Sequence, residues 1–185
     1  MYILLLVVIV VAATTAILFN RLVRDRNRVD AAWSDIDVQL QRRHDLIPQL
    51  VEAVKHYAAY EKATLEAVTE LRNAAGKVQD VEQRGAIEEQ VGKGINKLLL
   101  LAENYPDLKA SANFLKLQQD LVETENYLQF ARRFYNGAVR ALNTRVESVP
   151  HNIIANAFGF RQREFFQKAS DDVANVPLVN LGSVE

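Results

Sequence analysis

The chain has 185 residues, of which 49% are hydrophobic and 24% are charged, and its formal net charge at pH 7 is -1. This length gives room for one domain with one core, and the charges are too evenly spread to form the basic stripe that nucleic acid requires. The sequence has no cysteine, which excludes disulfides, thiolate metal sites, thiol nucleophiles and the acylated cysteine of a bacterial lipoprotein. With only 7 glycines and 4 prolines, the composition favours helix, and we predict an all-α protein.

The first 20 residues are predicted to be a transmembrane anchor. Residues 2–19 (YILLLVVIVVAATTAILF) contain no charge, glycine or proline. As a helix they extend about 28 Å, close to the thickness of a bilayer's hydrocarbon core. Residues spaced along this membrane-spanning segment are Tyr2, Leu5, Val8, Val11, Ala16 and Phe19. A cleaved signal peptide is the alternative, but no Lys or Arg precedes the apolar run and no clean A-x-A site follows it.

Four juxtamembrane arginines follow the apolar segment. They are Arg21, Arg24, Arg26 and Arg28, and only Asp25 and Asp30 oppose them nearby. Because basic residues gather on the cytoplasmic side of membrane helices, we predict a single-pass membrane protein. Residues from 21 onward then lie in the cytoplasm.

Residues 29–75 show apolar side chains at steps of three and four residues, which indicates one face of a helix. The pattern includes Val29, Trp33, Ile36, Leu40, Ile47, Leu50, Val54, Tyr57, Val68, Leu71 and Ala75. Pro48 could end one helix and begin another, but the unbroken phase favours a single helix with a kink at Pro48. In that helix the carbonyl of His44 lacks its usual donor. Residues 21–40 are expected to form a stalk near the membrane.

The next helix is predicted with less support from the pattern. Gly76 is a plausible end for the preceding helix, and Asp80 with Gln83 resembles a capping box that opens the new one. Three glycines follow, at positions 85, 92 and 94, and each lowers intrinsic helix stability by about 1 kcal/mol relative to alanine. They either allow close backbone packing or loosen this helix.

The longest regular pattern runs from Phe114 to Val149. A helix of about 36 residues is roughly 54 Å long and needs other helices along its apolar stripe. A neighbouring, mostly polar stripe comprises Gln118, Val122, Glu125, Gln129, Arg132, Asn136, Val139 and Asn143. We therefore predict that a transmembrane helix is followed, over residues 21–149, by an antiparallel up-and-down bundle of three long helices.

Pro150 ends this pattern, and residues 151–158 (HNIIANAF) predict a short helix that ends at Gly159. The tail beyond it carries too many large apolar residues for a disordered segment. We expect residues 150–185 to pack back on the bundle, and the alternative is an exposed patch for a partner or a lipid surface.

Several polar residues fall where the helices are expected to meet. We predict a buried polar layer formed by Arg43, Glu61, Glu125, Arg132 and Asn136, because a buried charge is costly unless it is paired. Polar layers of this kind fix helix register in coiled coils. The alternative is a polar pocket in which a buried glutamate acts as acid or base.

Four segments of the chain resemble the LemA family. They are AWSDIDVQLQRRHDLIPQLVEAVKHYAAYE (residues 32–61), AENYPDLKASANFLKLQQDLVETEN (102–126), ARRFYN (131–136) and NIIANAFGF (152–160), all behind one amino-terminal hydrophobic segment. The resemblance implies a protein of the bacterial inner membrane with a short outward-facing terminus, a cytoplasmic up-and-down helical bundle and no established biochemical activity. Ala112 departs from the family, which often carries an acidic residue there.

The sequence predicts neither catalysis nor a cofactor. None of the three histidines has the glutamate three residues earlier that di-iron bundles require. Glu52 and His56, four residues apart, supply only two metal ligands, and no phosphate-binding loop occurs. We expect a non-enzymatic scaffold or interaction module that binds the lipid bilayer, an unknown protein partner and further copies of itself through stalk residues Val29, Trp33 and Ile36. The alternatives are an enzyme or ligand carrier with a polar pocket, or an envelope-facing module.

Overall fold

The computed structural model describes residues 1–58, 62–78 and 80–166. Within these ranges the chain forms helices and no strand, as the composition predicted. The helices are α1 (Tyr2–Tyr57), α2 (Lys62–Ala75), α3 (Val81–Ala102), α4 (Pro106–Lys109), α5 (Ala112–Glu147) and α6 (His151–Phe158).

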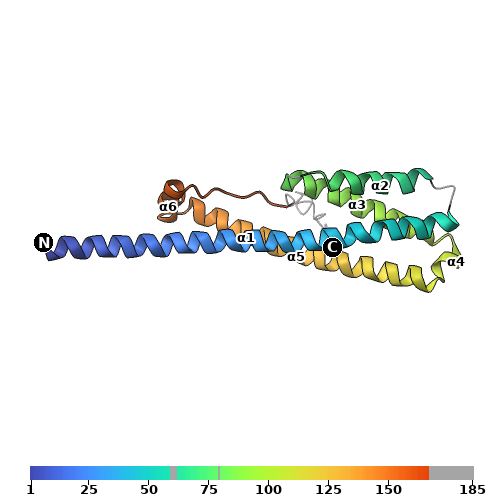
Figure 1. Ribbon diagram of the computed structural model, residues 1–185, viewed down its shortest axis with the longest axis horizontal. Helices are drawn as coiled ribbons and strands as arrows, with labels where there is room; N and C mark the ends of the chain where they lie inside the picture. The colour runs from blue at the N-terminus through green and yellow to red at the C-terminus, as the bar shows by residue number, and fades with distance from the viewer. Residues whose placement is uncertain (59–61, 79, 167–185) are drawn as a thin grey trace, which may run out of the picture.

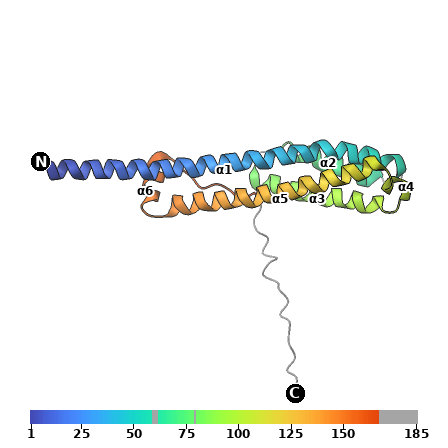
Figure 2. The same cartoon turned by 90° about the horizontal axis from the view of Figure 1, so that it is seen from below.

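The molecule is an elongated antiparallel bundle built along α1 (Figures 1 and 2). Helix α5 runs back along α1, while α2 and α3 form a hairpin against the part of α1 that is far from the amino terminus. Helix α6 lies at the opposite end of the bundle, where the first part of α1 projects without neighbours (Figure 1). The predicted fold, an apolar amino-terminal helix followed by an antiparallel bundle, is confirmed.

The projecting part of α1 has the length and composition of a membrane span. Among the described helices, α1 alone is long and apolar enough to cross a membrane, and none of its most apolar window is buried. Tyr2, Leu5, Val8, Val11 and Ala16 are all exposed, whereas Phe19 is partly covered by the bundle. Since no other described segment covers these apolar side chains, the structure is consistent with a bilayer around them.

The prediction of one helix from residue 29 to residue 75 is wrong at both ends. Helix α1 continues without a break from Tyr2 through the stalk to Tyr57, and a separate helix, α2, begins at Lys62. The apolar phase persists from one helix to the next because α1 and α2 face the same core, in which Val54 packs with Leu65 and Val68. A periodic pattern reports which face is buried and does not distinguish a straight helix from a hairpin.

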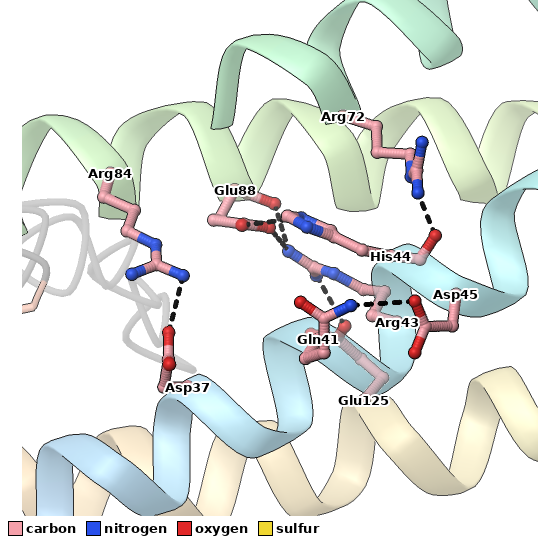
Figure 3. Close-up of polar contacts among 9 residues, drawn as sticks. All are labelled: Asp37, Gln41, Arg43, His44, Asp45, Arg72, Arg84, Glu88 and Glu125. Atoms are coloured by element: carbon pink, nitrogen blue, oxygen red, sulfur yellow. Dashed lines mark hydrogen bonds and ion pairs between the residues drawn. The ribbon is translucent and has the colours of Figure 1, made fainter. Parts of the chain in front are cut away.

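Pro48 lies inside α1, and a side chain from α2 satisfies the carbonyl that this proline leaves free. Arg72 Nε donates a hydrogen bond to the His44 carbonyl at 2.8 Å (Figure 3). The helix therefore continues through the proline with the orphaned acceptor paired.

The start of α3 and two of its glycines have clear structural roles. The Asp80 carboxylate accepts a hydrogen bond from the Gln83 amide at 2.8 Å, which confirms the predicted N-cap. A Cβ atom at Gly94 would lie 2.8 Å from Val68 Cγ2, and one at Gly85 would lie 1.9 Å from the Phe166 carbonyl oxygen. These two glycines therefore permit close packing rather than loosen the helix.

After α6, the chain returns along the bundle as an extended segment. Helix α6 ends at Gly159, whose φ of 73° confirms the predicted left-handed cap. The Asn143 side chain makes two hydrogen bonds with the backbone of Arg163. Its Oδ1 atom accepts from the Arg163 N–H at 2.8 Å, and its Nδ2 atom donates to the Arg163 carbonyl at 2.9 Å. Asn136 Oδ1 accepts from the Phe166 amide at 3.0 Å, and Phe166 is fully buried. The expected packing of residues 167–185 lies outside the described residues.

Two apolar cores lie one after the other along the rod. The core near the apolar end contains Val29, Ala32, Ile36, Leu40, Leu128, Tyr135, Ala138, Val139, Leu142 and Phe166. The far core contains Ile47, Leu50, Val54, Leu65, Val68, Val91, Ile95, Leu98, Phe114, Leu117 and Leu121, among others. Along α1 the first core ends at Leu40 and the second begins at Ile47, which leaves residues 41–46, a little under two helical turns, between them.

Candidate functional site

A cluster of charged side chains lies between the two cores, and all of its members except Glu125, which is 38% exposed, are buried. Arg43 and His44 come from α1, Glu88 from α3 and Glu125 from α5 (Figure 3). The Arg43 side chain is only 2% exposed and that of Glu88 is 0% exposed. Each helix carries leucine, isoleucine or valine on either side of its charged position, so the cluster interrupts an otherwise continuous apolar interior.

Arg43 is the centre of this cluster. Its Nη2 atom forms an ion pair with the Glu88 carboxylate and donates to the Glu88 backbone carbonyl at 2.9 Å. Its Nη1 atom donates to Glu125 Oε2 at 3.0 Å. One guanidinium thus joins α1 to both α3 and α5, and its planar, forked donors suit it to do so.

Glu88 is held from two sides. Its Oε1 atom lies 2.9 Å from His44 Nε2, while its Oε2 atom contacts Arg43. Burial alone raises the pKa of Glu88, but the hydrogen bond with His44 and the charge of Arg43 outweigh burial and lower that pKa below its usual value. The carboxylate is therefore ionised at neutral pH and is a weak proton acceptor.

Of the predicted polar layer, the structure brings Arg43 and Glu125 into direct contact. Glu61 lies outside the described residues. Asn136 is instead used to bind the backbone of the returning carboxyl-terminal segment. Arg132 lies beside the cluster with its guanidinium 5.1 Å from the centre of the Phe166 ring. Burial lowers the pKa of Arg132, and the nearby Glu125 carboxylate opposes that shift.

The sequence pattern missed Glu88, although a signal for it was present. The buried positions of α3 include 88, 91, 95, 98 and 102, which follow steps of three and four residues. Glu88 therefore lies on the apolar phase, whereas Ile87, one position out of that phase, is only partly buried. A charged residue at an in-phase position next to an out-of-phase isoleucine was the available indication.

A hollow of about 340 Å³ adjoins the cluster between α3 and α5. Its lining includes Arg43, Glu88, Lys93, Glu125, Gln129 and Arg132. Basic and acidic groups are both present, so the hollow has no strong preference for one sign of charge. Within the described ranges, no group of three or more His, Cys, Asp or Glu residues is arranged to hold a metal ion.

The four predicted juxtamembrane arginines lie at the start of the bundle and differ in their surroundings. Arg21 and Arg24 are exposed. The guanidinium of Arg26 lies 5.5 Å from the Phe160 ring centre, and that of Arg28 lies 5.1 Å from the Phe134 ring centre. The last two therefore also cover aromatic side chains of the bundle.

A second surface feature lies beside the first core, where α1 and α5 run together. Four large apolar side chains there are 46% to 62% exposed, and we call them the aromatic face: Val38, Tyr127, Phe130 and Phe134. They line a shallow groove of about 330 Å³ with Asp35, Gln39 and Ala131. Exposed apolar residues that are scattered singly are common, whereas these four lie together around one groove.

Comparisons with known proteins identify the family. Protein LemA of Metamycoplasma hominis is 25% identical, over 85% of this chain and 72% of that protein. Magnetosome protein MamQ 2 of Paramagnetospirillum magneticum is 25% identical and magnetosome protein MamQ of Magnetospirillum gryphiswaldense is 22% identical, each over 84% of this chain. The alignments cover 66% of the length of these two MamQ proteins. The LemA family model matches residues 32–181, and the chain belongs to the LemA family.

Proposed function

We propose that this LemA-family protein is a non-enzymatic scaffold: a helical bundle, anchored in a membrane by the start of α1, that associates with further copies through the aromatic face. The observation that carries the proposal is that aromatic face, in which Val38 of the anchor helix α1 lies beside three exposed aromatic side chains of α5. The charge cluster supports the bundle rather than a reaction, because its buried carboxylate, that of Glu88, is already paired with Arg43 and His44.

The continuity of α1 fixes the position of the aromatic face relative to the membrane. Val38 is 19 residues beyond Phe19, so the face lies about 28 Å along the helix from the end of the apolar segment. Copies anchored in one bilayer therefore present their aromatic faces at similar heights. Confinement to a plane raises their effective concentration, which favours weak lateral contacts.

The aromatic face replaces the contact surface that the sequence suggested. Val29 and Ile36 are buried against α5, and Trp33 packs on Tyr135 with ring centres 5.5 Å apart. These stalk residues serve the first core and are not available for contacts between copies. Val38 and the exposed aromatic side chains of α5 are accessible at nearly the same level of the rod.

Disulfide crosslinking in native membranes tests self-association, and the absence of cysteine from the chain makes single substitutions unambiguous. Val38→Cys should give crosslinked dimers. Adding Phe130→Glu to this variant should abolish the dimers without unfolding the bundle, because the Phe130 side chain is exposed. Leu100→Cys, an equally exposed apolar position on α3, is the matched control and should remain monomeric. Monomer alone from Val38→Cys at every protein level would contradict the proposal.

The orientation is part of the proposal and rests on the basic residues that follow the apolar segment. Arg21 and Arg24 are exposed beyond the apolar segment, which favours a cytoplasmic bundle. In intact cells, a membrane-impermeant maleimide should fail to label Leu100→Cys and should label it after lysis. Labelling in intact cells would place the bundle on the envelope side.

A ligand carrier is the second candidate function, and the hollow beside Arg43 favours it. Two nitrogen atoms of Arg132, Nε and Nη2, are buried there without a hydrogen-bond partner in the described part of the chain. A small polar molecule with acceptor oxygens would satisfy them. Denaturing extraction of the protein purified from its own membranes, followed by mass spectrometry, should release such a molecule in stoichiometric amount if the protein is a carrier. An empty extract would dispose of this function.

A further inference from the structure

Helix α6 lies at the height where the apolar segment of α1 ends. The Phe158 ring contacts the Phe19 ring with centres 4.9 Å apart, and the Phe160 ring contacts it at 5.6 Å. Phe19 is the last residue of the uncharged apolar run. If α1 spans a bilayer, these contacts place α6 at the boundary between the acyl chains and the lipid headgroups.

Three large apolar side chains in and next to α6 are exposed. We call them the apolar foot: Val149, which precedes α6, Ile153 on its outer side, and Phe158 at its end, and they are 58% to 77% exposed. The bundle side of α6 is already used, because Ala155 is fully buried and the Phe158 ring packs on Phe19. Packing on the bundle explains these contacts, and it leaves the exposed surfaces of Val149, Ile153 and Phe158 without an occupant in the described structure.

The charges around α6 match a lipid surface. Residues 148–160 contain no Asp, Glu, Lys or Arg. Exposed arginines lie at the same level on α1, at Arg21 and Arg24. Arg24 is five residues beyond Phe19, or about 8 Å along the helix, and this is close to the depth of the headgroup layer on one side of a bilayer.

We propose that the apolar foot inserts into the lipid surface of the bilayer that α1 spans, while Arg21 and Arg24 contact lipid phosphates. The occupant follows from continuity, since the foot adjoins the end of the segment that is itself surrounded by lipid. Amphipathic helices that bury an apolar face at the headgroup boundary bind membranes in this way. The protein is then held at two points, the anchor and the foot, which restricts the tilt and rotation of the rod. This inference rests on the membrane anchoring in the proposed function.

Site-specific quenching in the full-length chain tests the foot. The chain carries a single cysteine labelled with an environment-sensitive dye and is reconstituted in phosphatidylcholine–phosphatidylglycerol vesicles that contain an acyl-chain quencher. A dye on Ile153→Cys should lose fluorescence several-fold. A dye on Leu115→Cys, an exposed apolar position at the far end of α5, should be unchanged. A dye on Val8→Cys, within the apolar segment, reports on the anchor.

The three positions separate the outcomes. Strong quenching at Val8→Cys with none at Ile153→Cys would overturn the foot and leave the anchor intact. No quenching at either position would overturn both the foot and the anchoring in the proposed function. A third outcome also overturns the inference. The dye on Ile153→Cys could be unaffected by the acyl-chain quencher and yet be protected from aqueous iodide, with this protection lost on dilution. A second copy of the chain would then cover the foot in place of lipid.

Discussion

Replacing Arg43 with alanine tests the structural role of the charge cluster. The variant removes the guanidinium that contacts Glu88 and Glu125, and it leaves the carboxylate of Glu88, which is fully buried, without its main counter-charge. Removing one partner of a buried ion pair costs about 3–5 kcal/mol. For a protein of this size each kcal/mol lowers the melting temperature by about 2–4 °C, so we expect a decrease of roughly 6–20 °C.

The adjacent arginine provides a matched control. Arg42 also pairs with a glutamate of α5, Glu123, at 3.3 Å, but the two side chains are 42% and 48% exposed. An exposed pair of this kind contributes about 0–1 kcal/mol. Thermal unfolding followed by far-ultraviolet circular dichroism, on the detergent-solubilised chain with its anchor, should therefore show a large shift for Arg43→Ala and almost none for Arg42→Ala.

A double variant separates the cost of a lone charge from the cost of a lost contact. Arg43→Met combined with Glu88→Met removes both charges and fills the space with apolar side chains, which is often neutral for buried pairs. The double variant should be more stable than Arg43→Ala. Equal melting temperatures for Arg43→Ala and Arg42→Ala would refute the reasoning, because Glu88 would then not depend on Arg43.

Three further outcomes follow from the structure. Because the hydrogen bond with His44 and the charge of Arg43 outweigh burial and hold the pKa of Glu88 in the folded protein below its usual value, its contribution to stability is present above that usual value and is lost as the pH falls through the lowered pKa. Acid unfolding of Glu88→Gln should lack this component. Gly85→Ala should destabilise the protein and release the segment around Phe166, whereas Gly137→Ala, with no atom within 4 Å of its added Cβ, should be stabilising by about 0.5–1 kcal/mol in thermal melts. Arg72→Ala removes the hydrogen-bond donor to the His44 carbonyl, which Pro48 leaves without a helical partner. This change should lower the free energy of unfolding, measured by denaturant titration, by about 1–3 kcal/mol.

The sequence predicted helices well where a long pattern had clear stops. Helix α5 was expected from Phe114 to Val149 and is observed over Ala112–Glu147, since its apolar stripe is continuous and a proline follows it. The end of α1 at Tyr57 was missed because residues 58–61 contain neither glycine nor proline. Helices α1 and α2 bury the same phase of the apolar pattern, so only the tertiary structure distinguishes two helices from one.

The site was predicted in part for a related reason. Arg43 and Glu125 were identified because charged residues fell at or beside positions expected to be buried. Glu88 becomes the partner of Arg43 because of the way α3 packs on α1. The spacing of residues within a single helix does not predict how two helices pack on each other. Asn136 and Asn143 bind the backbone of an extended segment, and a hydrogen-bonding need of this kind leaves no trace in helical periodicity.

The charge cluster and the apolar foot are linked through the register of α5 on α1. Two long apolar stripes pack almost equally well when one slides by a helical turn, about 5.4 Å. In such a slide, Glu125 would leave Arg43, and Arg145 would leave Asp25, whose carboxylate lies 2.6 Å from Arg145 Nε. We interpret these pairs as the feature that fixes one register, as polar positions do in coiled coils. Because α6 follows directly from α5, the same register sets its height at the end of the apolar segment. A slide of one turn would carry the foot most of the way across the headgroup layer, so the interior charges determine whether the foot meets lipid at the correct depth.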